Sequence, residues 1–99
     1  MAPAPSDLRA RVFDELYQAH RQTLHAFFLG RTGDAELALD LVQDTFVRVW
    51  RSLGTVADLA AERQRAWLFS IARNLVIDQL RALLAQHGIV PESIDGSSL

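Results

Sequence analysis

Two carboxylates and an amide share one face of a predicted helix over residues 40–51, DLVQDTFVRVWR. At 100° per residue, the polar side of this helix holds Asp40, Gln43, Asp44, Arg48 and Arg51. Side chains three and four positions apart lie within about 5–6 Å of each other on a helix. Exposed carboxylates accept charge-assisted hydrogen bonds from basic groups, above all from arginine. The spacing therefore predicts a docking face for a basic protein surface, and its alternative is a solvated face.

The same carboxylates could instead belong to an enzyme, as metal ligands or as an acid–base pair. No histidine lies at ligand spacing from Asp40 or Asp44, and no glutamate motif recurs on another helix. His20 and His25 are five positions apart and point to different sides of their helix. The sequence holds no cysteine, nucleophile constellation, phosphate loop or dinucleotide fingerprint. We expect no catalytic residue, metal site or cofactor.

A second group of polar side chains surrounds a tryptophan near the end of the chain. An exposed Trp67 is predicted on a helical face that also holds Ser70, Arg73, Asn74, Asp78 and Arg81, with Ile77 inside it. A large aromatic ring among hydrogen-bonding side chains is unusual for a purely solvated face. Either Trp67 contacts a ligand, or it packs back onto the first helix as part of the core.

Three long apolar repeats at helical spacing must position these residues. We expect helices from Ser6 to Gly30, from Ala35 to Leu53 after an Asp34 cap, and from Ala66 to Leu84. Gly54 is expected to stop the second helix, and residues 55–58 resemble a capping box. The buried stripe of the first helix is predicted to hold Leu8, Val12, Phe13, Leu16, Tyr17, His20, Leu24, Phe27 and Phe28. The side chains predicted to face the core from the last two helices are Leu39, Val42, Phe46, Val49, Trp50, Leu68, Ile71, Ala72, Leu75, Val76, Leu80 and Leu83.

The predicted fold is all-α: a compact antiparallel bundle of three long helices plus a short helix or ordered loop. Residues 1–6 are expected to be a disordered leader, residues 7–87 a helical domain, and residues 88–99 a linker or flexible tail. No apolar run is long enough to span a membrane, and no signal peptide is evident. We expect a monomeric cytoplasmic domain. Its net charge of −2 argues against binding of nucleic acid by bulk charge alone.

Two segments, DLVQDTFVRVWR and AWLFSIARNLVIDQLR, resemble the region 2 domain of bacterial RNA polymerase sigma factors, particularly the extracytoplasmic-function (group IV) kind. The resemblance extends from about Phe13 to Arg81. It implies that the helix over residues 40–51 docks on the clamp helices of the polymerase's largest subunit. Asp40, Gln43 and Asp44 would make the polar contacts. The remaining candidates for polymerase contact are Phe46, Arg48, Trp50 and Arg51.

The resemblance further implies that residues 53–81 recognise and open the promoter −10 element on the non-template strand. The candidate DNA-contacting residues are Arg63, Gln64, Arg65, Trp67, Ser70, Arg73, Asn74 and Arg81. An aromatic ring can stack on an unpaired base, amides and hydroxyls can read base edges, and arginines can hold phosphates. The resemblance also implies an anti-sigma protein as a regulatory partner.

Several features depart from the family pattern. The segment Gly54–Glu62 is apolar and acidic, and Ala82–Gln86 lacks the arginines often found there, so we expect weak DNA affinity. Sigma factors of this family also contain a helix-turn-helix domain that reads the −35 element, and nothing after Gly88 can form it. We expect the chain to be either an excised domain of a longer factor or a shortened relative. These departures favour an alternative function, a sigma-like module that binds polymerase or a regulator without touching DNA.

Overall fold

A computed structural model of the chain describes residues 5–88, and every regular element within that range is an α-helix. The helices are α1 (Pro5–Thr32), α2 (Ala35–Arg51), α3 (Leu53–Val56) and α4 (Ala61–Gln86). The predicted all-α fold with three long helices and one short helix is therefore confirmed. Across residues 5–88, no helix is long and apolar enough to cross a membrane.

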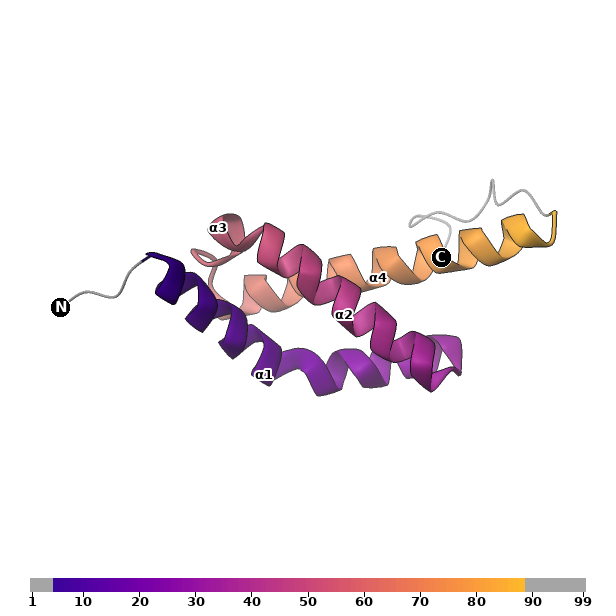
Figure 1. Cartoon of the computed structure of the whole chain (residues 1–99), viewed down its shortest axis with the longest axis horizontal. Coiled ribbons are helices and arrows are strands. Elements are labelled where there is room, and N and C mark those ends of the chain that lie inside the picture. The colour runs from indigo at the N-terminus through magenta and orange to yellow at the C-terminus, as the bar shows by residue number, and fades with distance from the viewer. Residues whose placement is uncertain (1–4, 89–99) are drawn as a thin grey trace.

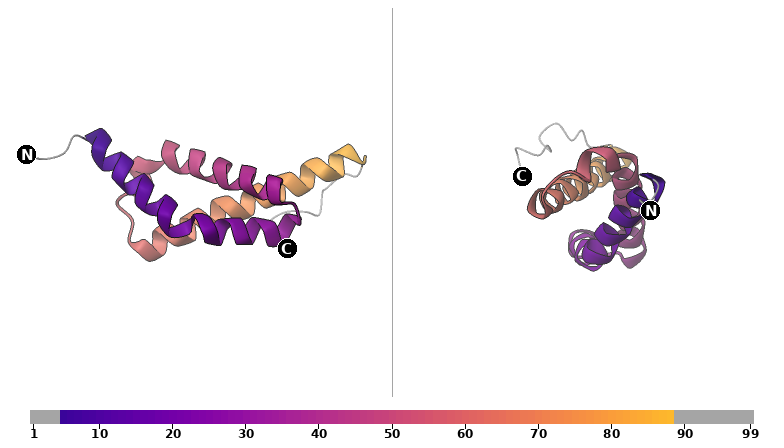
Figure 2. Two further views of the ribbon diagram at one scale, coloured as in Figure 1. Left: turned by 60° about the horizontal axis from the view of Figure 1, so that its bottom comes forward. Right: turned by 90° about the vertical axis from the view of Figure 1, so that its left-hand side faces the viewer.

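The three long helices form an elongated bundle (Figure 1). Helices α1 and α2 run antiparallel as a hairpin, and α4 crosses beside them, antiparallel to α2. The short α3 lies at the opposite end of the bundle from the α1–α2 turn (Figure 1). The last turns of α4 project beyond that turn, as Figure 1 and the left view of Figure 2 show. The final part of α4 therefore has fewer helical neighbours than its beginning.

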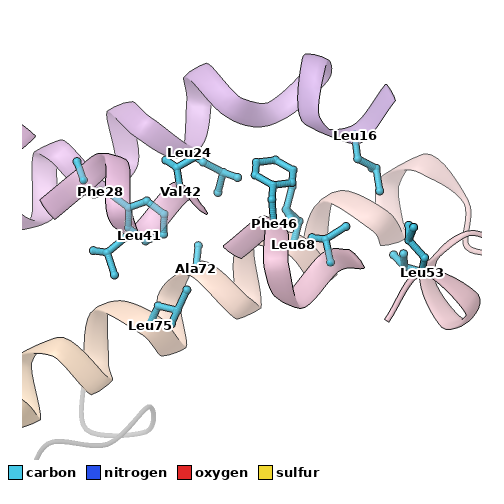
Figure 3. Close-up of a cluster of buried hydrophobic side chains, with 13 residues drawn as sticks. Leu16, Leu24, Phe28, Leu41, Val42, Phe46, Leu53, Leu68, Ala72 and Leu75 are labelled. Carbon is cyan, nitrogen blue, oxygen red and sulfur yellow. The ribbon is translucent and has the colours of Figure 1, made fainter. Parts of the chain in front are cut away.

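One continuous core joins all four helices (Figure 3). Leu24 and Phe28 of α1 belong to the same buried cluster as Leu68 and Ala72 of α4, and all four side chains are fully buried. The buried Thr45 leaves no unsatisfied hydroxyl, because its Oγ1 donates to the Leu41 carbonyl at 2.7 Å. The core fixes which face of each helix remains outside.

The α1–α2 turn is formed by a left-handed glycine followed by a side-chain cap. Gly33 has a φ of 67° and donates its N–H to the Leu29 carbonyl at 2.8 Å. The Asp34 carboxylate then accepts from the N–H groups of Glu36 and Leu37 at 3.0 and 3.1 Å, which confirms the predicted cap. The predicted helix end at Gly30 is wrong by two residues, because α1 continues to Thr32 and Gly33 supplies the positive φ.

The connection between α2 and α4 differs from the prediction in two ways. Helix α2 ends at Arg51, and Gly54 lies inside α3 instead of stopping α2. The capping box expected over residues 55–58 does not start a helix, because α4 begins at Ala61 after an extended Ala60 without a side-chain cap. Gln64 holds this connection instead, since its Nε2 donates to the Val56 carbonyl at 3.0 Å.

Helix α4 starts five residues earlier than the predicted Ala66 and ends two residues beyond the predicted Leu84. The polar segment before Ala66 forms the start of the helix. Most of its side chains are exposed, so it lacks the apolar repeat from which the helix was predicted. Arg63 and Gln64 therefore lie on a helix, and the predicted loop is confined to the residues between Val56 and Ala61.

Five side chains predicted to face the core are exposed: Leu8, Leu39, Trp50, Leu80 and Leu83. A wide apolar arc on a helical wheel contains flanking positions that a neighbouring helix does not reach. Leu80 and Leu83 are also close to the projecting end of α4. Conversely, Ile77 was predicted within the polar arc but is only 6% exposed.

The predicted leader and tail fall largely outside the described residues. Pro5 and Ser6 belong to α1, so the helix begins one residue before the predicted cap. Residues 1–4 and 89–99 lie beyond the described range. Gly88 follows α4 with a φ of 74° and donates its N–H to the Ala85 carbonyl at 3.1 Å.

Candidate functional site

The exposed side of α2 presents the polar residues that the sequence singled out. Asp40, Gln43 and Asp44 are all exposed, while Leu41 and Thr45 bury the opposite side of the helix. Within residues 5–88, neither carboxylate forms a hydrogen bond or ion pair. The two negative charges are therefore available to an external cation.

Arg48 and Arg51 continue this exposed face in the last turn of α2. The carboxyl end of a helix carries a partial negative charge, so cations are favoured there. Their position thus has an explanation within the helix itself. The exposed face of α2 therefore carries positive charge at its carboxyl end and negative charge at Asp40 and Asp44.

The predicted contact residue Phe46 is only 3% exposed and belongs to the core. Its ring packs edge-on against Tyr17 and Phe13, at centroid distances of 5.0 and 5.9 Å. The prediction of Phe46 as a surface contact is therefore corrected, because its ring has little area left for a partner. Trp50 is 51% exposed and lies at 5.3 Å from Phe13, at the edge of the same aromatic cluster.

Helix α1 adds residues to this surface that the sequence prediction missed. A shallow depression beside Gln43 and Trp50 is lined from α1 by Phe13 and Tyr17. The Arg21 guanidinium lies over the Tyr17 ring, at 5.4 Å from its centroid. The four-residue spacing of the two α1 aromatics was the available signal, but it was interpreted as a purely buried stripe.

On α4, polar candidates form a strip on the side opposite the core. Arg63, Ser70, Asn74 and Arg81 follow one another at steps of seven, four and seven residues, so they share one helical face. The strip is about 27 Å long at 1.5 Å per residue. Arg73 is exposed on the flank of this strip. The helix therefore brings together three of the predicted arginines and one amide.

Three of the predicted base-reading groups are partly occupied within the chain. The Gln64 amide donates to Val56, as described above, and the Ser70 hydroxyl donates to the Trp67 carbonyl at 2.6 Å. Trp67 was predicted to be exposed, but it is half-buried and packs against the core. This partial burial agrees with the predicted alternative in which Trp67 packs on the core, and a contact between Trp67 and DNA stays a prediction.

Arg65 does not lie with the other arginines. Its guanidinium sits over the Phe69 ring at 5.9 Å and lines a depression with Glu15, Glu62 and His20, between α1 and the start of α4. Burial lowers the pKa of His20 below its ordinary value because it disfavours the imidazolium, and the positive charge of Arg65 lowers it further. This end of α4 is thus a separate environment from the strip.

This lowered pKa predicts how stability depends on pH. Between the ordinary histidine pKa of about 6.5 and the lower folded value, the unfolded chain binds a proton that the folded chain does not. The free energy of unfolding should therefore fall as the pH drops through that window. Urea denaturation at pH 7.5 and 5.5 should show a smaller decrease for His20→Gln than for the wild type. The exposed control His87→Gln should behave as the wild type; equal pH dependence of all three would contradict the prediction.

Metal-ligating side chains do not gather in the described part of the chain. No group of three or more His, Asp or Glu residues lies close enough to hold an ion between residues 5 and 88. His20 and His25 are both half-buried on α1.

Comparison with known proteins identifies the family. The family model for sigma-70 region 2 matches residues 16–84. The chain is 41% identical over 73 residues to the ECF RNA polymerase sigma factor SigL of Mycobacterium tuberculosis, which covers 74% of this chain and 41% of that protein. It is 37% identical over 68 residues to the ECF sigma factor SigM of Bacillus subtilis, covering 69% of this chain and 40% of that protein. It is 36% identical over 73 residues to the ECF sigma factor BldN of Streptomyces coelicolor, covering 74% of this chain and 27% of that protein.

The chain spans about two fifths or less of the length of these relatives. No solved structure matches it. The family match runs from the first half of α1 to the last turn of α4 and includes both the exposed face of α2 and the strip on α4. The chain therefore belongs to the sigma-70 region 2 family, in the form found in extracytoplasmic-function sigma factors.

Proposed function

We propose that this chain is a non-catalytic module of transcription initiation that docks on RNA polymerase through α2 and meets promoter DNA through α4. The partner of α2 is the pair of clamp helices in the largest polymerase subunit. The partner of α4 is the −10 element, with its non-template strand unstacked. An anti-sigma protein that covers one or both faces is a further partner.

One observation carries the docking half of the proposal: Asp40 and Asp44 are exposed side by side without an internal partner. A helix stabilised only within itself would gain from pairing these charges with Arg48, which lies four residues after Asp44. Leaving the carboxylates open suits a basic partner that supplies the missing hydrogen bonds. Gln43 adds a donor and an acceptor between them, and Trp50 adds an apolar edge.

The DNA half of the proposal is supported by the arginine and amide strip on α4. Its length of about 27 Å covers several phosphates of a strand. Asn74 is exposed near the middle of the strip and can both donate to and accept from a base edge. Because the chain has a net charge of −2, its affinity for DNA should be low and should depend on this local patch.

The DNA half is tested with a single-stranded oligonucleotide that carries a −10 element. Fluorescence anisotropy at low salt should show that Asn74→Ala weakens binding by about 1–3 kcal/mol, because a base contact of this kind is worth that much. The matched control is Gln86→Ala, an exposed amide in the last turn of the same helix, which should bind as the wild type. An equal loss in both variants, or no loss in either, would contradict a base-reading role for the strip.

The internal hydrogen bonds of α4 favour one alternative, a module that binds polymerase or a regulator without touching DNA. Gln64 and Ser70 already use a donor within the chain, and Trp67 packs against the core. Such a module would bind a clamp-helix fragment but show no measurable affinity for the oligonucleotide, so the same pair of assays separates the two functions.

A further inference from the structure

The exposed side of α2 changes its sign of charge along the helix. Asp40 and Asp44 precede the exposed Val47, while Arg48 and Arg51 follow it. At 100° per residue, Asp40, Asp44 and Arg51 fall within about 40° of one another, on one line along the helix. Across the described residues, none of these four charged side chains forms a hydrogen bond or ion pair. A face of this kind is complementary to itself when a second copy runs in the opposite direction.

The spacing of the charges agrees with a two-fold axis between residues 45 and 46 of α2. In an antiparallel pair of α2 helices centred there, Asp40 and Arg51 lie on opposite sides of the axis, each about 8 Å from it. Asp44 and Arg48 lie on opposite sides as well, about 2 and 4 Å from it. Each carboxylate therefore lies opposite an arginine of the second copy, and the symmetry repeats both pairs. A parallel pair would instead place like charges opposite each other.

The flank of α2 that faces α1 adds an apolar contact to this pair. Leu39 and Trp50 are 53% and 51% exposed and lie about 20° apart on the helical wheel. Trp50 lines a shallow depression together with Phe13 and Tyr17 of α1. In the same antiparallel pair, Leu39 is about 10 Å from the axis on one side and Trp50 about 7 Å on the other. Leu39 of each copy therefore lies over the aromatic depression of the other.

We propose that two copies of this chain associate through α2 as an antiparallel pair with two-fold symmetry. One pair of helices makes a smaller interface than the roughly 1,200–2,000 Å² that stable complexes bury, so the association is weak, with a dissociation constant of about 0.1–1 mM. The monomer that the sequence predicts then describes dilute solutions of the domain.

Pairing and polymerase docking use the same side chains. The pair covers Asp40, Asp44 and Trp50, so a paired copy does not present this face to the clamp helices. This consequence rests on the function proposed above, whereas the pairing itself does not. A polymerase that binds only the single copy shifts the equilibrium away from the pair.

Sedimentation equilibrium of the wild type between about 10 µM and 1 mM measures the pairing, and the average mass should rise toward that of a dimer. Asp40→Arg and Arg51→Asp should each weaken association by at least about tenfold, because each places like charges opposite each other twice. An equimolar mixture of the two variants should associate about as strongly as the wild type. In the mixed pair, each new charge lies opposite the new charge of the other variant, so both ion pairs are restored. Recovery in the mixture also shows that both variants fold.

The matched control is Asp78→Arg, which makes the same charge change at an exposed position on α4. It should associate as the wild type does. Three results would each overturn the pairing: a wild type that stays monomeric at about 1 mM, single variants that associate like the wild type, or a mixture that does not recover.

The consequence for docking is tested by adding an excess of the clamp-helix fragment to the wild type at about 1 mM. Complexes that hold one copy of the chain should replace the pair, and a complex that holds two copies would overturn the exclusion. If the fragment does not bind at about 10 µM, where the chain is monomeric, the proposed docking function fails. The sedimentation of the variants and their mixture still decides whether the chain pairs.

Discussion

Asp44→Lys is expected to weaken binding of this chain to an isolated clamp-helix fragment by more than about tenfold at moderate salt. Asp44 is exposed and has no partner within residues 5–88, so the substitution removes a charge that only an external partner would use. A hydrogen bond to a charged group contributes about 1.5–3 kcal/mol, and the new lysine adds repulsion from a basic partner. A loss of 1.4 kcal/mol is already tenfold in affinity.

The matched control is Asp78→Lys, which makes the same charge change at an exposed position on α4. It should bind the clamp-helix fragment as the wild type does, apart from a small effect of net charge. Circular dichroism and thermal melting should show that both variants fold. If Asp44→Lys binds as well as Asp78→Lys, the exposed face of α2 is not the docking surface. If the folded wild type does not bind at all, the docking half of the proposed function is wrong.

Phe28→Ala is expected to have the largest effect on stability. Phe28 is fully buried where α1 meets α2 and α4, and its neighbours Leu24 and Leu41 are also held in the core. Truncating a buried phenylalanine to alanine costs about 3–5 kcal/mol. A domain of this size has a total stability of only about 5–10 kcal/mol, so this single change should remove about half of it.

Thermal denaturation followed by circular dichroism measures this effect. The Phe28→Ala variant should melt at least about 12 °C below the wild type, since 1 kcal/mol corresponds to about 4–8 °C in a small domain. Leu29→Ala is the control, because Leu29 is the next residue on α1 and is exposed. Its melting temperature should change by only a few degrees. Similar shifts in the two variants would show that Phe28 does not hold the bundle together as its burial indicates.

The sequence predicts the helices well because apolar residues recur at helical spacing over many turns. Leu16, Leu24 and Phe28 recur on one stripe, and each is buried as that stripe requires. Helix ends are less predictable, because glycine can end a helix or lie within one. Gly33 has a positive φ and ends α1, whereas Gly54 sits in α3. Only the packing of neighbouring helices distinguishes the two positions.

The candidate residues were predictable as helical faces but not as contacts. A helical wheel places Asp40 and Asp44 together, and the structure leaves both exposed. The same wheel cannot show that Phe46 lies under two rings from α1, because that depends on how the α1–α2 hairpin closes. It also cannot show that Gln64 bonds to Val56, since this contact joins residues across the loop before α4. The family resemblance supplies roles for these residues, and their roles remain predictions.

The net charge conceals an uneven distribution of charge, because Asp40 and Asp44 lie at one end of the α2 face while exposed arginines lie on α4. The formal charge of −2 is a sum over the whole chain, while the carboxylates of α2 and the arginines of α4 point away from the core they share. Two oppositely charged macromolecules would therefore each attract a different side and turn the domain toward its correct orientation before contact. Salt screens these attractions, so added salt should slow association with both macromolecules. A protein of the same net charge without this local separation of charges would instead repel DNA.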